Sequence, residues 1–402
     1  MVTGAPEGAP GQQHTRHGGR TLQRDTRHYK DFEFNLRELA GSMGDFGTLF
    51  PLAIGLIAVN RMDPVALFVM IGLTNIVTGL VYRLPMPVEP KKVVSVAAIA
   101  QGWPASLVAA SGLGLGIVWF VLALSGLMRR LVAITPVYVI RGIQLALGIT
   151  LGMQAVRLAL PAPWWALAAI GIILLLRESK YAPAALVIMG LGVGIMAVRG
   201  DLLPHLTFGI SLPRWQPPRL GEVWQAMVLA GFAQIPLTLT NAVLATATMI
   251  RDLFPDKPVS EERLMLNMGA MNVASSFFGG MPLCHGSGGL AGQYYFGART
   301  GGTNILEGLI EIALGVFLGR SLLGILSAFP MPLIGGMMLM VGVQFVQPIL
   351  RLRRWALALA LLTAAVSVAT NMAFGFLAGL AAAHLLRWLA ARGVPTVSAE
   401  EL

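Results

Sequence analysis

Long apolar runs, separated by charged residues and by clusters of proline and glycine, recur along almost the whole chain. Many of them approach or exceed the length of helix that spans a hydrocarbon core of roughly 30 Å. The pattern predicts an all-α polytopic membrane protein of fourteen segments, seven on each side of a proline-rich linker at 201–222. The expected segments are 38–58, 64–82, 88–101, 105–128, 132–156, 163–177, 182–199, 223–249, 262–280, 285–297, 303–319, 322–347, 353–370 and 371–391.

Two of these segments, 88–101 and 285–297, are too short to cross a membrane alone. Pro87 and Pro90 precede the helical part of the first, and Pro282 precedes the second. Proline cannot donate a backbone hydrogen bond, and it disfavours helical conformation in the residue before it. We therefore expect each segment to be an extended strand followed by a half-helix, with the two half-helices meeting near the middle of the membrane.

The two halves of the chain, residues 36–200 and 223–392, resemble each other in sequence. An odd number of segments in each half gives the halves opposite orientations, as in the inverted repeats of many secondary transporters. The individual matches are weak, but their offsets of 195, 194 and 190 residues nearly agree, which favours a repeat. The matched pairs are "MPVEPKKVV" with "MPLCHGSGG", "TPVYVIRGIQLALGI" with "FPMPLIGGMMLMVGV", and "LAGSMGDFGTL" with "LAGFAQIPLTL".

Composition and charge support a membrane protein. Only 12% of the 402 residues are charged, against about a quarter in soluble domains. The net charge of +10 is explained by the positive-inside rule rather than by nucleic-acid binding, and its distribution predicts both termini in the cytoplasm, in an inner or plasma membrane. Residues 1–35 are polar and basic without an apolar core, so we expect a disordered cytoplasmic tail rather than a signal peptide.

Polar residues gather where the two half-helices begin. A helix amino terminus offers unpaired amides and a partial positive charge, and two such termini facing each other make an anion site. The alternatives are close helix packing for the glycines and a cytoplasmic pair for the two lysines. The candidate substrate-binding residues are Glu89, Pro90, Lys91, Lys92, Cys284, His285, Gly286, Ser287 and Gly288.

Further polar residues lie inside apolar segments. Gln234, Thr238 and Asn241 share one face of the eighth segment, where they would complete an oxyanion site with neutral donors or would pack one helix against another. Buried carboxyl groups in membranes often carry protons. Asp45 is therefore a candidate for ion coupling, the alternative being a structural hydrogen bond.

Glu307 and Glu311, four residues apart, share one face of the eleventh segment. Two buried carboxyl groups so close together are rarely both ionised. They are the second candidate for ion coupling, as a proton relay; the alternative is that Asn304, Arg299 or a neighbouring chain caps them.

Three stretches, "GDFGTLFPLAIGL" (44–56), "PMPVEPKKVVSVAAIA" (85–100) and "MPLCHGSGGLAGQYYFGARTGG" (281–302), together resemble the molybdate transporter family of plants and algae, which is similar to a branch of the sulfate permease superfamily. The resemblance covers about residues 35–390. It implies the fold of uracil permease, with segments 1–4 and 8–11 as a core domain and segments 5–7 and 12–14 as a gate domain. It also implies transport of a tetrahedral oxyanion, and homodimers are common on this fold.

The chain departs from this resemblance twice. Sulfate permeases usually continue into a STAS domain, and we expect none here because the sequence stops at Leu402. Molybdate carriers often have Gln-Pro-Met-Lys where this chain has Glu89-Pro90-Lys91-Lys92. A carboxylate beside an anion is unfavourable unless it is paired or protonated.

The sequence therefore predicts a secondary active transporter of molybdate that works by an elevator-like movement, without cofactor, metal or enzymatic activity. Proton symport would help a dianion against an inside-negative potential, which costs about 2.3 kcal/mol per charge per 100 mV. The alternatives are a sulfate transporter, a nucleobase or organic-anion permease in which Glu89 reads N–H groups, and an anion channel.

Overall fold

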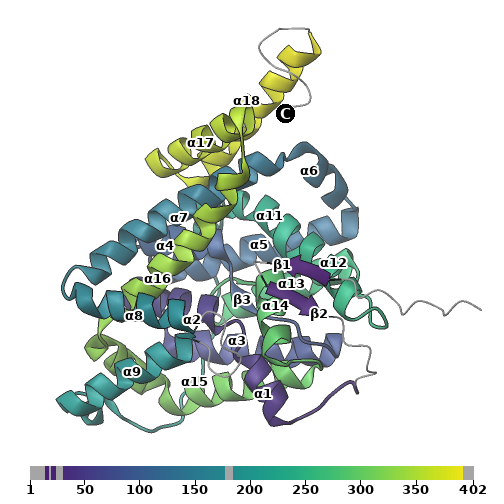
Figure 1. The fold of residues 1–402 in the computed structure, drawn as a ribbon. Helices are drawn as coiled ribbons and strands as arrows, with labels where there is room; N and C mark the ends of the chain where they lie inside the picture. The colour runs from purple at the N-terminus through teal and green to yellow at the C-terminus, as the bar shows by residue number, and fades with distance from the viewer. Residues whose placement is uncertain (1–13, 18–19, 24–29, 177–183, 393–402) are drawn as a thin grey trace, which may run out of the picture.

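The computed structural model describes residues 14–17, 20–23, 30–176 and 184–392. Within them the chain is almost entirely helical, with two small two-stranded sheets (Figure 1). Seven described helices are long and apolar enough to cross a membrane, or eight if the bent pair at 36–58 counts as one span. The protein is thus an integral membrane protein, while the count of fourteen spans stays a prediction.

The helices of the first half follow the predicted segments with two exceptions. The first segment is bent by 50° between its two helices, and a short helix, α6, occupies the predicted connection between 105–128 and 132–156, so that the next long helix begins only after Pro136. Residues 177, 182 and 183, at the ends of two predicted segments, lie outside the described residues. The helices are α1 (Leu36–Ser42), α2 (Phe46–Ala58), α3 (Pro64–Tyr82), α4 (Lys92–Gln101), α5 (Ala105–Ser125), α6 (Met128–Ile134), α7 (Val137–Ala159), α8 (Pro163–Leu175) and α9 (Ala184–Arg199).

In the second half, one continuous helix of 34 residues covers Leu220–Leu253 and includes two π-helical turns. The helices are α10 (Leu220–Ala226), η2 (Met227–Gly231), α11 (Phe232–Thr238), η3 (Leu239–Leu244), α12 (Ala245–Leu253), α13 (Glu261–Phe277), α14 (Ser287–Phe296), α15 (Gly302–Ala328), α16 (Met331–Val346), α17 (Arg354–Ala369) and α18 (Met372–Ala391), with 3-10 turns η1 (Leu203–His205) and η4 (Gln347–Arg351).

The predicted break between segments 303–319 and 322–347 is wrong. Arg320 lies within α15, which continues to Ala328, and the chain turns at Pro330. An exposed arginine does not end a helix, whereas a proline forces the residue before it into extended conformation. Phe329 has that conformation, with φ −64° and ψ 140°.

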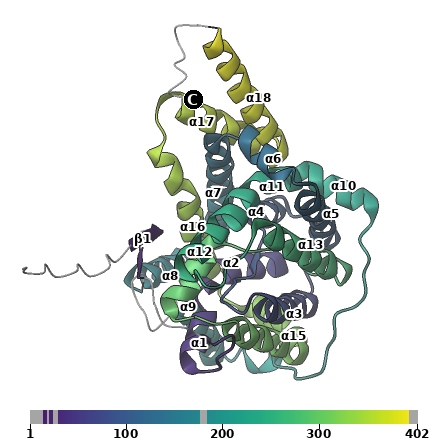
Figure 2. The same cartoon turned by 90° about the vertical axis from the view of Figure 1, so that its right-hand side faces the viewer.

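Two groups of helices can be distinguished by their packing. In one, α15 packs along α3 and α13 packs along α5. In the other, α16, α17 and α18 pack on α7, and α8 packs on α16. Figures 1 and 2 show α17 and α18 beside α7 at one end of the molecule and α3 and α15 at the other. A Cβ on Gly72 would lie 2.6 Å from the carbonyl oxygen of Gly308, so glycine allows α3 and α15 to approach closely.

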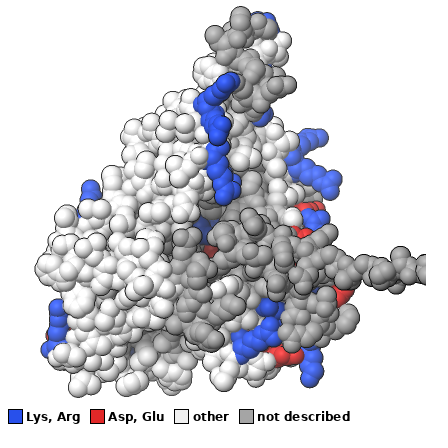
Figure 3. All heavy atoms as spheres, in the orientation of Figure 1, with Lys and Arg blue, Asp and Glu red and all other residues white. Residues whose placement is uncertain are grey.

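Large apolar side chains cover much of the outer surface. On α3, Leu73, Val77 and Leu80 are about half exposed, whereas Asn75 on the opposite face is fully buried. Uncharged residues dominate the left side of the face in Figure 3, and the visible lysines and arginines lie mostly along its upper and right-hand parts. A polar interior beneath an apolar exterior is the arrangement that a lipid environment favours.

The N-terminal tail lies for the most part outside the described residues, and its disorder stays a prediction. Two of its described segments, β1 (His14–His17) and β2 (Arg20–Gln23), pair antiparallel. The linker at 201–222 runs along α15, where the amide of Ser211 donates to the carbonyl of Val316 at 2.9 Å.

Two short strands lie inside the helical bundle and lead into two short helices, α4 and α14. β3 (Glu89–Pro90) pairs antiparallel with β4 (Leu283–Cys284). β3 precedes α4, and β4 precedes α14. Each of these helices has ten residues, and they begin 195 positions apart, at Lys92 and Ser287. This is the strand and half-helix arrangement that the prolines predict.

Candidate anion-binding site

Two buried asparagines fix the backbone of the segments that lead into the half-helices. Asn304 on α15 accepts from the amide of Met86 at 2.9 Å and donates to its carbonyl oxygen at 2.6 Å. Asn272 on α13 does the same for Leu283, at 2.9 and 2.7 Å. Each lead-in strand is thus paired with the other strand and with one asparagine side chain, which satisfies backbone groups that are buried away from water.

The carboxyl end of α4 is capped, whereas its amino end faces a pocket. The side-chain amide of Asn60 donates to the carbonyl oxygens of Ala98 and Trp103 at 2.7 and 2.8 Å. Gln154 on α7 donates to the carbonyl oxygen of Ile99 at 3.0 Å. These bonds satisfy carbonyl groups that the end of a helix leaves unpaired.

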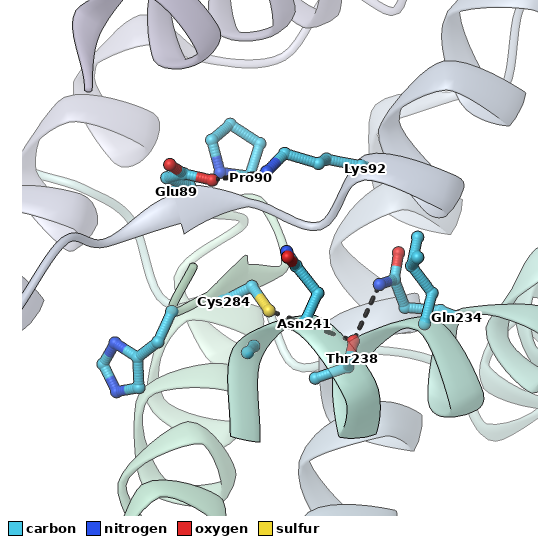
Figure 4. A pocket seen from close by; sticks show the side chains of 10 residues that line it. Glu89, Pro90, Lys92, Gln234, Thr238, Asn241 and Cys284 are labelled. Atoms are coloured by element: carbon cyan, nitrogen blue, oxygen red, sulfur yellow. Dashed lines mark hydrogen bonds and ion pairs between the residues drawn. The ribbon is translucent and has the colours of Figure 1, made fainter. Parts of the chain in front are cut away.

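The pocket lies between the β3–β4 pair and the long helix of the second half (Figure 4). Eight of the twelve predicted substrate-binding residues line it. Leu237 and Ala242 line it as well, and the sequence gives no sign of them because they are apolar residues in an apolar helix. The lining residues are Glu89, Pro90, Lys92, Gln234, Leu237, Thr238, Asn241, Ala242, Cys284 and His285.

Lys92 and Glu89 form an ion pair in this pocket. The ammonium nitrogen of Lys92 lies 2.8 Å from Oε2 of Glu89, and the side chains are 18% and 2% exposed. Lys92 neutralises the Glu89 carboxylate as long as no anion binds Lys92. An anion that binds Lys92 would remove this partner and restore the predicted repulsion between a carboxylate and an anion. Burying an ion pair also carries a desolvation cost that the attraction must offset.

Lys91 does not line the pocket. It is fully buried, and its ammonium nitrogen lies 4.9 Å from the centre of the Trp119 ring on α5. Cys284 is the polar side chain with which it interacts electrostatically. The ammonium nitrogen of Lys91 makes no hydrogen bond to any described residue. The two adjacent lysines therefore point to different sides of α4, because Lys91 precedes the helix and Lys92 is its first residue.

The amino end of α14 lies beside the pocket, but Gly286, Ser287 and Gly288 do not line it, and the Glu89 carboxylate lies against this helix end. Gly286 caps the helix without a side chain, and no hydrogen bond among the described residues uses the amides of Ser287, Gly288 or Gly289. A Cβ on Gly286 would lie 2.9 Å from Oε2 of Glu89, and one on Gly289 would collide with Oε1. The Glu89 carboxylate thus lies against the helix end that would attract an anion.

The neutral residues of the long helix share one face, as predicted. Nε2 of Gln234 donates to the hydroxyl of Thr238 at 2.8 Å, and its Oε1 accepts from the amide of Val93 on α4 at 2.8 Å. Asn241 accepts from the hydroxyl of Ser287 at 3.0 Å. The long helix therefore contacts the amino ends of both half-helices, and Figure 4 shows Gln234, Thr238 and Asn241 on it.

His285 and Cys284 are held by neighbouring residues. The two ring nitrogens of His285 lie 3.0 Å from the carbonyl oxygen of Pro87 and 3.0 Å from Oδ1 of Asn267. The Cys284 sulfur lies 3.9 Å from the hydroxyl of Thr238. His285 therefore links the two lead-in segments, and neither of its nitrogens is free for a ligand in this conformation.

The three predicted coupling carboxyl groups lie together, fully or almost fully buried. Asp45 and Glu307 interact electrostatically with each other. Glu307 also accepts from Gln293 on α14 at 3.2 Å. Glu311 accepts from Asn75 on α3 at 2.8 Å. Because two neighbouring buried carboxyl groups cannot both be ionised without a large cost, this cluster is suited to hold a proton.

Sequence reasoning missed Asn75 and Asn272, and it named Asn304 only as a cap for the carboxyl pair Glu307 and Glu311. Asn304 donates to Asn75 at 2.8 Å as well as to Met86, so it joins the carboxyl cluster to the segment before β3. The signal was present in the sequence, since Asn75, Asn272 and Asn304 are amides within apolar segments. Polar residues at membrane depth face the protein interior and bind something there.

The chain is similar to known transporters over most of its length. A family described as "Molybdate transporter of MFS superfamily" matches residues 37–151 and 226–345. Molybdate transporter 1 of Arabidopsis thaliana is 33% identical, with 87% of each chain covered. Molybdate transporter 1 of Chlamydomonas reinhardtii is 30% identical and covers 85% of this chain and 90% of that protein.

Solved structures of other anion transporters share the fold. The transmembrane domain of the cyanobacterial bicarbonate transporter BicA superimposes with a TM-score of 0.62 at 18% identity, covering 86% of this chain and 97% of that one. Murine Solute Carrier 26 family member A9, an anion transporter in the inward-facing state, gives a TM-score of 0.65 at 13% identity, with 90% and 69% covered.

Proposed function

Since this chain belongs to the molybdate transporter family, we propose that it is a secondary active transporter that imports molybdate. The observation that carries the proposal is the pocket lined by Lys92 and by the neutral donors of the long helix, with the amino end of α14 directly after its lining residues Cys284 and His285. A dianion there would meet one full positive charge, free amides and the positive end of a helix dipole. The relatives' names are the reason for ranking molybdate before sulfate, which has the same charge and shape.

The proposed movement is elevator-like: the core domain, segments 1–4 and 8–11, carries the bound anion past the gate domain, segments 5–7 and 12–14, with both termini in the cytoplasm. The two packing groups support this division, since α3, α5, α13 and α15 pack among themselves and α7, α8, α16, α17 and α18 do so as well. The pocket is lined by core elements only, as a carrier that moves with its substrate requires.

Proton coupling is the second part of the proposal. Asp45, Glu307 and Glu311 would carry protons that enter with the anion. Their burial, the electrostatic interaction between Asp45 and Glu307, and the link through Gln293 to α14 support this role. Protons would offset the negative charge that a dianion moves against the membrane potential.

The test is uptake into proteoliposomes of molybdate, tungstate, sulfate and uracil, each with and without an inward proton gradient. We expect molybdate and tungstate to accumulate, and to accumulate further with the gradient. Uptake of uracil without any oxyanion would reject the assignment and favour a nucleobase permease. Current that follows voltage without accumulation would indicate a channel.

A further inference from the structure

The carboxylate of Glu89 occupies the part of the pocket that is most favourable for an anion. It lies 2.8 Å from the ammonium of Lys92 and against the amino end of α14, where Gly286 and Gly289 leave room for it. These two features are also the strongest attractions for an oxyanion in the pocket. A substrate dianion and an ionised Glu89 therefore compete for the same partners.

We propose that Glu89 links proton binding to oxyanion binding. Its carboxylate occupies the position of the anion beside Lys92, and it leaves this position when it is protonated. The proton adds to a carboxylate oxygen of Glu89, and the ion pair with Lys92 breaks. The ammonium of Lys92 then pairs with the incoming dianion. When the anion leaves, Glu89 releases its proton and the ion pair with Lys92 forms again.

Electrostatics favours this order of events. With Glu89 ionised, a bound dianion would face a carboxylate within the same buried pocket, and like charges at short distance in a poorly solvated site repel strongly. With Glu89 neutral, the loaded site carries one negative charge less. A carboxylic acid can also donate a hydrogen bond to the oxyanion, whereas a carboxylate can only accept.

The surroundings of Glu89 provide both its counter-charge and other titratable groups. From α4 it faces Lys92. From the segment before α2 and from α15, Asp45 and Glu307 interact with it electrostatically. Two further titratable groups lie on β4 and just after it, where Cys284 is its strand partner and His285 lines the same pocket. The buried Lys91 acts electrostatically on both of them. The buried carboxyl cluster thus acts electrostatically on Glu89, and Glu89 is the only one of these carboxyl groups that lines the pocket.

This inference rests on the proposed transport of an oxyanion, and equilibrium binding tests it separately from uptake. The dissociation constants of molybdate and sulfate are measured on the purified full chain at several pH values between about pH 5.5 and pH 8. For the wild type, linkage of one proton to one anion weakens binding by up to about tenfold per pH unit as the pH rises. The Glu89→Gln variant should bind at all these pH values as tightly as the wild type binds at low pH.

Two further variants and one measurement complete the test. Glu89→Asp keeps a titratable carboxyl group and should keep the pH dependence. Glu262→Gln makes the same chemical change at an exposed carboxyl group and should behave as the wild type. In weakly buffered solution, a pH indicator should report about one proton taken up per anion bound by the wild type, a result that does not depend on any variant folding.

The outcomes separate the inference from the function on which it rests. If the wild type binds neither oxyanion at any pH, the proposed function fails. If the wild type binds an oxyanion without taking up protons, or if Glu89→Gln keeps the wild-type pH dependence, the role of Glu89 is wrong and the transport function stands. A folded Glu89→Gln variant that binds no anion would also overturn the inference, because Glu89 would then be a direct ligand.

Discussion

Asn272 and Asn304 hold the two lead-in segments in the same way, each through one side-chain amide that binds both the amide and the carbonyl of a single residue. One asparagine lies on α13 and the other on α15, in the half that follows the linker. The positions of both strands, and with them the directions of both half-helices, therefore depend on polar groups buried in apolar helices.

Replacing Asn272 with alanine should weaken both folding and anion binding. It leaves the amide and carbonyl of Leu283 buried without partners, at about 1–3 kcal/mol for each group. Thermal unfolding in detergent and the dissociation constant of molybdate measure the two effects. The control is Asn371→Ala, which removes the amino-terminal cap of α18 and should cost about 1 kcal/mol of stability without changing affinity. Equal affinity losses in the two variants would contradict a local role of Asn272.

The two neighbouring lysines should respond differently to replacement by methionine. Lys92→Met removes the ammonium that lines the pocket and should weaken binding of an oxyanion by more than tenfold, since a charged hydrogen bond contributes about 1.5–3 kcal/mol. Lys91→Met removes a buried ammonium that has no hydrogen-bond partner in the described part of the chain, so it should raise the unfolding temperature. Its effect on affinity should be smaller, because Lys91 acts on the pocket only through its electric field. A larger loss for Lys91→Met would show that Lys91 turns into the pocket when the anion binds.

Gly289 should not tolerate even a methyl group. The added Cβ would collide with Glu89 and lie 2.8 Å from the Cβ of Pro87, which would displace β3 from the amino end of α14. We expect Gly289→Ala to unfold at a lower temperature and to bind molybdate more weakly. The control is Gly194→Ala on α9, where an added methyl group meets no atom within 4 Å and alanine should stabilise the helix by up to about 1 kcal/mol. Equal stability of the two variants would contradict the crowding at Gly289.

Glu307 and Glu89 should have different roles in proton coupling. Glu307→Gln removes a carboxyl group from the buried cluster, and it should lower the stimulation of uptake by a proton gradient while equilibrium binding keeps its pH dependence. Glu89→Gln should remove the pH dependence of binding itself. Proteoliposome uptake and equilibrium titration, performed on both variants, distinguish the two roles. Identical behaviour in both assays would mean that the four carboxyl groups act as one titrating unit.

An ion-pair cluster outside the membrane-spanning helices should make stability depend on pH in strong acid. Asp31 lies 2.9 Å from Lys257 and 2.9 Å from Arg83, and the hydrogen bond from Lys257 lowers the pKa of Asp31 below its ordinary value of 3.8. A lowered pKa stabilises the folded state above the ordinary pKa, and the benefit is lost as the pH falls through the lowered value. Asp31→Asn should therefore unfold at a lower temperature than the wild type near neutral pH, and the two should converge in strong acid. Convergence at neutral pH instead would exclude a stabilising role for this cluster.

The sequence by itself determined the membrane-spanning character, the two half-helices and most of the pocket. These follow from local rules, since Pro90 and Pro282 fix where a helix cannot begin, and the spacing of Gln234, Thr238 and Asn241 fixes one helix face. The same local rules failed at Arg320, where a charge was taken for a helix end although the next proline was the actual break.

Only the tertiary structure decided which polar groups meet. Lys91 and Lys92 are equivalent in sequence, and it is the packing of α5 that places Trp119 over one and leaves the other in the pocket. The interaction of Asp45 with Glu307 and the bonds of Asn304 to Met86 join residues more than two hundred positions apart. The spacing of residues within one helix cannot predict such a contact, because the contact depends on how the two halves of the chain fold against each other. For the same reason, the Glu89 carboxylate could be placed against the amino end of α14 only once β3 and β4 were seen to pair.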